Sequence, residues 1–196
     1  MKDAIVQVGD PVLRAKAKPV AKADLGSPAL SKLLKTMSTT LAKEGFGVAI
    51  AAPQVGESLR IFVVSGKVFE EPESDETEAR GEARPSGHEA LESPSHPSPD
   101  LVFINPEITK LSRKKREMSE GCLSVRGKYG TVMRSEKCSV RAWDESGNVF
   151  TYNASGLLAQ IFQHECDHLD GTLYIDKAVK LEDDTKRTEL RDKHHA

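Results

Sequence analysis

The sequence predicts an α+β domain in which antiparallel or mixed β-strands surround a central helix, with an N-terminal helix packed outside. Two segments far apart in the chain, residues 28–44 and 156–171, carry apolar residues at helical spacing. Between them lie short segments rich in β-branched and aromatic residues. At 196 residues the chain is long enough for one hydrophobic core.

The first helix is predicted over residues 28–44. Ser27 is a suitable N-cap and Pro28 suits the first helical position. Its apolar residues recur at helical spacing: Leu30, Leu33, Leu34, Met37 and Leu41. We interpret this stripe as ordinary core packing, ending at Glu44.

Residues 45–56 are unusually rich in glycine and alanine, so the backbone there can approach another chain or a ligand closely. Gln54 is the only polar side chain of the run that can project a donor. From these residues alone, a crossover from helix to strand with Gln54 facing solvent is the better reading. A short strand is predicted next, over residues 59–64.

A long acidic segment interrupts the chain from about Glu70 to Asp100. It has too little apolar surface to offset its ordering entropy, so we expect a disordered insertion, or else a partner-binding loop. His88 and His96 within it are expected to be solvated. The expected organisation is one catalytic domain over 1–176, with this insertion at 70–100, and a polar C-terminal tail over 177–196. His194 and His195 in that tail are not expected to be ligands.

More strands are predicted after the insertion. Residues 101–106 read as a strand that Pro106 ends, with 108–111 as a possible extension. Arg113 to Arg116 form a basic cluster, best read as a solvated turn and less well as a phosphate contact. Residues 138–143 and 149–152 form a hairpin around Asp144-Glu145-Ser146-Gly147, with Trp143 in the core.

The second helix carries the residues with the clearest chemistry, the run Gln163-His164-Glu165-Cys166-Asp167-His168. On a helix, His164 and His168 lie one turn apart on the same face and can bind one metal ion. Glu165 falls beside them, where it can act on a water molecule. Leu157 and Ile161 continue the same face, and Gly171 marks the end of the helix. The non-functional alternative is a solvated helix on which this spacing arose by chance.

A hydrolytic metal site needs a third protein ligand. Cys122 is one candidate, because Gly121 before it permits a turn that aims the thiol inward. The other candidates are the carboxylates after the helix, namely Glu182, Asp183, Asp184 and Glu189. Those acids lie in a polar tail, so Cys122 is better placed. A carboxylate ligand would instead indicate a zinc-dependent HExxH endopeptidase.

Composition excludes several classes of function. The formal net charge of −2 gives no electrostatic signal for nucleic-acid binding, and no apolar run approaches the length of a membrane span. Three cysteines, an odd number, favour a reducing compartment. The N-terminal residues lack a secretory signal, so we expect a cytoplasmic protein, or one in the lumen of an organelle of bacterial ancestry after loss of any targeting segment.

Three separated motifs resemble those of the peptide deformylase family, in the family's order and spacing apart from the acidic insertion. They are Gly47-Val48-Ala49-Ile50-Ala51-Ala52-Pro53-Gln54, Glu120-Gly121-Cys122-Leu123-Ser124 and Gln163-His164-Glu165-Cys166-Asp167-His168. The likeness extends from about Gly9 to Ile175.

This resemblance implies a metal-dependent hydrolase that removes the formyl group from formyl-methionyl peptides, releases formate and acts in N-terminal methionine processing. It implies one divalent metal ion on Cys122, His164 and His168, typically Fe²⁺, with Zn²⁺, Ni²⁺ or Co²⁺ as substitutes. Glu165 would be the general base. The side-chain amide of Gln54 and the backbone N–H of Leu123 would stabilise the oxyanion.

The resemblance also places the substrate. Leu157, Ile161 and Val48 would line an apolar pocket for methionine, and the backbone near Gly47 would pair with the peptide as an added strand. Glu120 and Arg134 would form a supporting ion pair. Nascent peptides are the implied partners, and association with the ribosome is an expectation for the family. No membrane or direct nucleic-acid partner is expected.

Three features depart from the family pattern: Ala49 replaces a usual glycine, Arg126 a common proline, and the acidic insertion has no usual counterpart of its length. If position 49 needs a positive φ, alanine there costs stability. The departures leave a non-enzymatic alternative, a metal-containing peptide-binding module whose acidic loop is the interaction arm. Retention of Glu165 argues against this alternative, because a binder needs no base.

Overall fold

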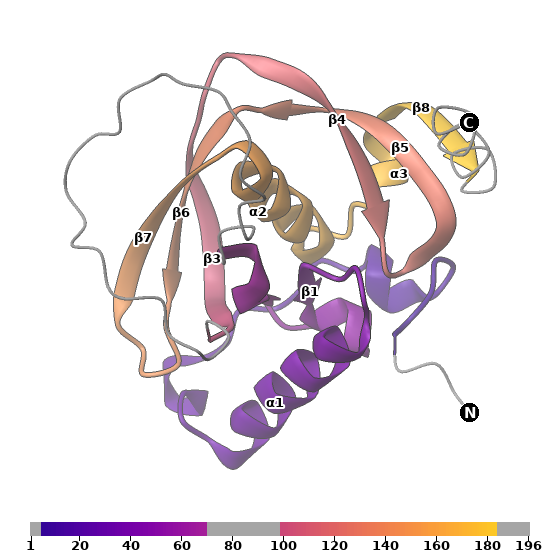
Figure 1. Ribbon diagram of the computed structural model, residues 1–196. Coiled ribbons are helices and arrows are strands. Elements are labelled where there is room, and N and C mark those ends of the chain that lie inside the picture. The colour runs from indigo at the N-terminus through magenta and orange to yellow at the C-terminus, as the bar shows by residue number, and fades with distance from the viewer. Residues whose placement is uncertain (1–4, 70–98, 184–196) are drawn as a thin grey trace, which may run out of the picture.

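The computed structural model describes residues 5–69 and 99–183, which form two antiparallel sheets around a central helix (Figure 1). The five-stranded sheet has the order β1 (Ala49–Ala51), β2 (Ile61–Val64), β3 (Leu101–Leu111), β6 (Lys137–Trp143), β7 (Val149–Ser155). The three-stranded sheet has the order β4 (Lys115–Cys122), β5 (Val125–Ser135), β8 (Ala178–Asp183). The α-helices are α1 (Pro28–Lys43), α2 (Gly156–Leu169) and α3 (Tyr174–Lys177), and short 3₁₀ turns cover Pro11–Arg14, Lys22–Asp24, Ala52–Val55 and Gly66–Phe69. The predicted α+β class is confirmed.

Helix α1 begins as its local signals predict. The Ser27 hydroxyl accepts a hydrogen bond from the Leu30 N–H at 3.2 Å, which satisfies one of the amides that a helix start leaves unpaired. Pro28 occupies the first turn. The buried face of the helix packs on the outer face of the five-stranded sheet through Leu30, Leu34, Met37 and Leu41. The predicted first helix is therefore confirmed.

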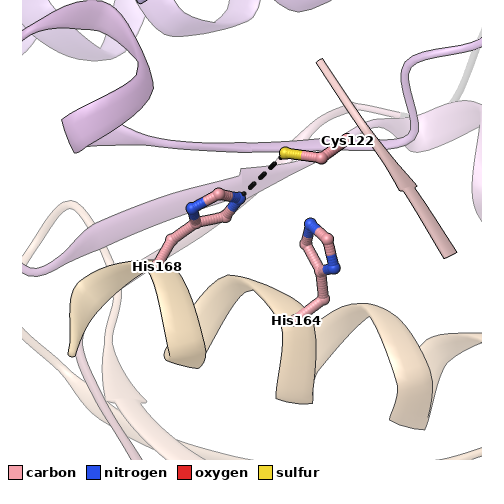
Figure 2. A group of neighbouring side chains, drawn as sticks. All are labelled: Cys122, His164 and His168. Atoms are coloured by element: carbon pink, nitrogen blue, oxygen red, sulfur yellow. Dashed lines mark hydrogen bonds between the residues drawn. The ribbon is translucent and has the colours of Figure 1, made fainter. Parts of the chain in front are cut away.

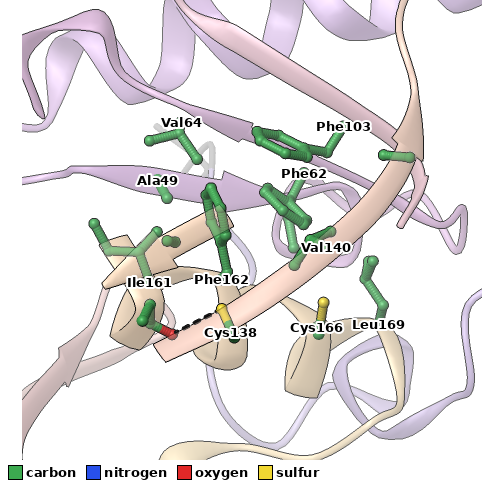
Figure 3. Close-up of a cluster of buried hydrophobic side chains, with 14 of the residues drawn as sticks. Ala49, Phe62, Val64, Phe103, Cys138, Val140, Ile161, Phe162, Cys166 and Leu169 are labelled. Atoms are coloured by element: carbon green, nitrogen blue, oxygen red, sulfur yellow. Dashed lines mark hydrogen bonds between the residues drawn. The ribbon is translucent and has the colours of Figure 1, made fainter. Parts of the chain in front are cut away.

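Strand β2 is buried on both faces, because helices cover both sides of its sheet. Its alternate residues Ile61 and Val63 belong to the cluster with α1, whereas Phe62 and Val64 pack toward α2 (Figure 3). The Phe62 and Phe103 rings stack at 4.5 Å between centroids, and Phe162 of α2 lies 4.9 Å from Phe103. Burying each of these rings stabilises the fold by about 2–3 kcal/mol, so this cluster anchors α2 to the sheet.

Strand β3 runs through Pro106, so the prediction that proline ends it is wrong. Asn105 has φ +51°, and the register shifts between Ile104 and Glu107, which marks a bulge. The bulge lets proline stay in the strand without losing a ladder hydrogen bond. The Asn105 carboxamide also bonds the backbone N–H and C=O of Val20, each at 2.8 Å. This segment therefore also fixes the N-terminal arm.

Helix α2 is tied to the three-stranded sheet by one buried carboxamide. Gln163 accepts from the Ser135 N–H at 3.0 Å and donates to the Ser135 carbonyl at 2.9 Å. Gly171, with φ +73°, lies just past the helix end, as predicted. The aromatic cluster and Gln163 together fix both the depth and the rotation of α2.

The C-terminal part differs from the expected polar tail. Residues 178–183 form β8, which pairs antiparallel with β5 from Lys128 to Val132. Residues 184–196, with His194 and His195, lie outside the described residues, as do residues 70–98 of the expected insertion, with His88 and His96. Among the helices of the described ranges, none has the length and apolar character needed to cross a bilayer.

Candidate metal and catalytic site

Cys122, His164 and His168 converge beside α2 (Figure 2). Cys122 ends strand β4, and the two histidines lie one turn apart on the helix. The Cys122 Sγ lies 3.2 Å from His168 Nε2, and one potential ligand atom from each of the three residues lies within 4.8 Å of the others. Burial raises the pKa of the Cys122 thiol, but the adjacent histidines outweigh this effect and lower it to about 5, which favours the thiolate.

A chain of buried charges orients His164. Its Nδ1 lies 2.9 Å from Glu120, which in turn accepts two hydrogen bonds from Arg134, at 2.7 and 2.9 Å. Arg134 also donates to Asp167 at 2.6 Å. Burial opposes ionisation of Glu120, yet the hydrogen bonds from Arg134 and His164 lower its pKa to about 2. A carboxylate on one ring nitrogen leaves the other nitrogen for a metal, as in many metal-binding histidines.

Glu165 is buried in the same region, and its Oε2 has no hydrogen-bond partner within the described ranges. Burial raises the pKa of Glu165 to about 6, although the two histidines partly counteract this rise. A carboxylate whose pKa lies near neutrality can both accept and return a proton. Its environment therefore suits acid–base work.

Gln54 is buried, so the reading in which it faces solvent is wrong. Its Oε1 accepts from the Ala51 N–H at 2.8 Å. Its Nε2 faces Ser124 Oγ at 3.2 Å and Cys122 Sγ at 3.5 Å. These contacts fix the carboxamide with its donor end toward the cysteine.

Leu123 and Ser124 form the tight turn between β4 and β5, in which Cys122 pairs with Val125. Gly121 has another role than the predicted one, because it lies within strand β4. A Cβ on Gly121 would lie 2.8 Å from the Tyr129 ring on the neighbouring strand. Gly121 therefore makes room for Tyr129, and the hairpin turn aims Cys122.

A cavity of about 710 Å³ opens onto this cluster. All five residues expected to bind substrate line it: Gly47, Val48, Ala49, Leu157 and Ile161. Strand β1 is the edge of its sheet, so its backbone can accept an added strand. Ala49 lies in β1 and is not among the residues with positive φ, so alanine there carries no such strain.

The donor set fits one divalent ion. A thiolate and two imidazoles are ligands that Zn²⁺, Fe²⁺ and related ions accept, and three protein ligands leave a position for water or substrate. The carboxylates of the endopeptidase alternative are placed differently. Glu182 and Asp183 are exposed on β8, and Asp183 pairs with Lys128 at 3.2 Å, while Asp184 and Glu189 lie outside the described residues.

Sequence reasoning did not find Ser124 and Asp167 as site residues. Ser124 is buried beside Gln54, and Asp167 bridges Arg134 and Lys177, at 2.6 Å to each. Both residues lie inside the motifs given above. Gln54 and Arg134, their buried partners, are 70 and 33 positions away, so the sequence around Ser124 and Asp167 does not indicate these contacts.

Comparisons with known proteins identify the family of the chain. A family model described as polypeptide deformylase matches residues 2–184. A peptide deformylase of Dictyoglomus thermophilum is 39% identical over 185 residues, covering 94% of this chain and 96% of that protein. One of Desulforudis audaxviator is 36% identical over 177 residues, covering 90% and 94%. The class I type b peptide deformylase of Acinetobacter baumannii, solved with Met-Ala-Ser bound, superposes with a TM-score of 0.69 at 32% identity, covering 88% and 96%. The chain therefore belongs to the peptide deformylase family.

Proposed function

We propose that Glu165, Gln54 and Leu123 carry out the family's reaction in this chain, the hydrolysis of the formamide bond of an N-terminal formyl-methionine to give formate and a free amine. The observation that carries this proposal is that Cys122, His164 and His168 converge, and that Cys122 and His164 line one cavity with Glu165, whose buried Oε2 has no hydrogen-bond partner among the described residues. A reactive carboxylate beside a three-ligand metal group is the arrangement that metal-assisted hydrolysis requires.

Glu165 has the acid–base role. With its pKa near 6, the carboxylate accepts a proton from the attacking water and returns it to the leaving amine. Its position next to His164 in the helix keeps it beside the metal ligands without making it one. Proton transfer by a positioned carboxylate contributes about 10²–10⁴-fold to the rate.

Two donors face the oxyanion that forms on the formyl oxygen: the Gln54 side-chain amide and the Leu123 backbone N–H. Gln54 is pre-oriented by Ala51 and Ser124, so it needs no reorganisation during the reaction. Leu123 directly follows Cys122 in the hairpin turn, which supports this role for its amide.

Cys122, His164 and His168 would hold one divalent ion, which supplies Lewis-acid activation of water and of the formyl carbonyl. We propose Fe²⁺ as the native ion, on the family resemblance. Zn²⁺, Ni²⁺ and Co²⁺ suit the same ligands. Glu120 keeps His164 in the orientation that ligation needs.

The cavity suits a methionyl peptide. Ile161 and Leu157 supply apolar surface for an unbranched side chain, and the edge of β1 supplies backbone groups that pair with the peptide. We propose nascent formyl-methionyl chains at the ribosome as the natural substrates, in the cytoplasm or in an organelle where synthesis starts with formyl-methionine.

Formate release from a formyl-Met peptide tests the proposal, with iron-loaded protein purified anaerobically and the Glu165→Ala variant beside it. The parent should release formate, and the variant should keep its metal and lose about 10²–10⁴-fold in kcat. Absence of release from metal-loaded parent protein would overturn the proposed function. Full activity of the variant would overturn the role of Glu165.

A further inference from the structure

An ion pair lies in the lining of the cavity that Cys122, His164 and Glu165 also line. The Arg126 Nη2 donates to the Glu44 Oε1 at 3.2 Å, and both residues line the cavity. Glu44 is the C-cap of α1, and Arg126 is the second residue of β5, just after the turn that carries Leu123. The pair therefore joins two cavity walls whose residues are 82 positions apart in the chain.

One of these walls is weakly held. Residues 45–47 are Gly45, Phe46 and Gly47, and Phe46 is fully exposed. The backbone there makes a bond from the Gly47 N–H to the Glu44 carbonyl at 3.1 Å, and Val48 accepts from Ser65 at 2.9 Å. A segment with so little buried apolar surface opens at a low free-energy cost. A charge contact at its start is therefore a significant restraint.

The two walls also lie close together at Gly47. A Cβ built on Gly47 would lie 3.4 Å from the Leu123 Cδ1. The segment whose backbone leads into β1 thus lies close to Leu123, whose backbone amide is the proposed oxyanion donor. The distance between these walls determines whether a peptide can pair with β1 while its formyl group reaches Leu123.

We propose that Arg126 and Glu44 are a positioning pair for the peptide portion of the substrate. They hold residues 45–48 at the spacing in which the substrate backbone beyond formyl-methionine pairs with the edge of β1. This inference rests on the proposed function. The pair acts on binding of the peptide rather than on the chemical step, because neither side chain belongs to the metal cluster or to its hydrogen-bonded carboxylates.

The expected effect is modest because the pair is partly exposed, with 49% of the Arg126 side chain accessible and 24% of Glu44. Pairs of this kind contribute about 0.2–1 kcal/mol, which corresponds to about a 1.4- to 5-fold change in an equilibrium constant. Arg126→Gln and Glu44→Gln should each raise KM for formyl-Met-Ala-Ser by about this factor, with kcat unchanged. KM for formyl-methioninamide, which has no peptide beyond methionine, should not change.

The charge-swapped double variant Glu44→Arg with Arg126→Glu should restore KM for the tripeptide, because it re-forms the pair. Arg141→Gln is the charge-matched control, since it breaks an exposed pair with Glu107 outside this cavity. Calorimetric binding of the product Met-Ala-Ser measures the same effect without turnover. The single variants should bind it about 1.4- to 5-fold more weakly.

The positioning role would be overturned by unchanged KM and product affinity in both single variants, by an equal loss of kcat for both substrates, or by a swapped variant that fails to recover. A swapped variant that reverses the preference for charged third residues would show direct contact with the substrate and would also overturn it. A parent that releases no formate would overturn the proposed function instead, and product binding would still decide the role of the pair.

Discussion

Arg134 donates two hydrogen bonds to the Glu120 carboxylate, at 2.7 and 2.9 Å, and both side chains are almost completely buried. Glu120 in turn bonds the ring of His164. The ion pair therefore connects the interior of the three-stranded sheet to a candidate metal ligand on α2. A paired buried charge is tolerated, but removing one partner leaves the other charge desolvated.

Replacing Arg134 by methionine should lower the free energy of unfolding by about 3–5 kcal/mol, because Glu120 would stay buried without its partner. Denaturant titration of the metal-loaded protein measures this loss. Arg141→Met is the control, since the Arg141–Glu107 pair is exposed on both sides and should contribute less than about 1 kcal/mol. Equal losses in the two variants would contradict the structural importance of the buried pair.

Gln54→Leu should reduce kcat by about 10²–10³-fold, the usual cost of one lost oxyanion donor. Ser124→Ala should reduce kcat much less, because Ser124 only orients the carboxamide of Gln54. Steady-state formate release from a formyl-Met peptide compares the two. If Ser124→Ala were as damaging as Gln54→Leu, the hydroxyl itself would have to act on the substrate.

Gly171 and Gly127 form a matched pair for testing backbone constraint, because both have φ +73°. Alanine at Gly127 meets no atom within 4 Å and should cost about 1–2 kcal/mol from the backbone conformation alone. Alanine at Gly171 should cost more, because its Cβ would lie 2.5 Å from the Arg14 carbonyl oxygen. Thermal unfolding of the two variants measures the difference. Similar melting temperatures would show that the 171 loop moves away from Arg14.

Asp176→Asn should reduce the loss of unfolding free energy that the protein shows at acid pH. The hydrogen bond from the Arg14 side chain lowers the pKa of Asp176, burial opposes this effect, and the hydrogen bond from the Leu173 N–H, at 2.8 Å, lowers the pKa further. A carboxyl whose pKa is depressed on folding stabilises the protein above its unfolded pKa of about 3.9, and this contribution disappears as the pH falls below that value. At pH 7 the free energy of unfolding of the parent should exceed that of the variant by about 0.5–1 kcal/mol. A difference that persisted at pH 2.5 in urea titrations would contradict this origin.

Local signals were sufficient for both long helices. Ser27, Pro28 and the apolar stripe define the start and the buried face of α1, and Gly171 marks the end of α2. These features depend on residues within a few positions of each other. The convergence of His164 and His168 on one helical face is local for the same reason.

The burial of Gln54 could not be predicted from neighbouring residues, because its partner Ser124 lies 70 positions away.

Strand β8 was not predicted for another reason. Its residues Val179 and Leu181 are largely exposed, so the strand is held by backbone pairing with β5 rather than by an apolar face. An edge strand made mostly of charged residues has the same composition as a polar chain terminus, so composition does not distinguish the two. Pro106 was misread because the bulge at Asn105 that accommodates it leaves no clear sequence signal.

The three candidate ligands come from two layers of the fold, with Cys122 on β4 and His168 on α2, 46 positions apart. An ion bound to both would link two segments that are distant in the chain. Because the unfolded chain holds no preformed site, the binding free energy of the ion would add to the free energy of unfolding. A chelator would then shorten the lifetime of the folded enzyme as well as stop its turnover.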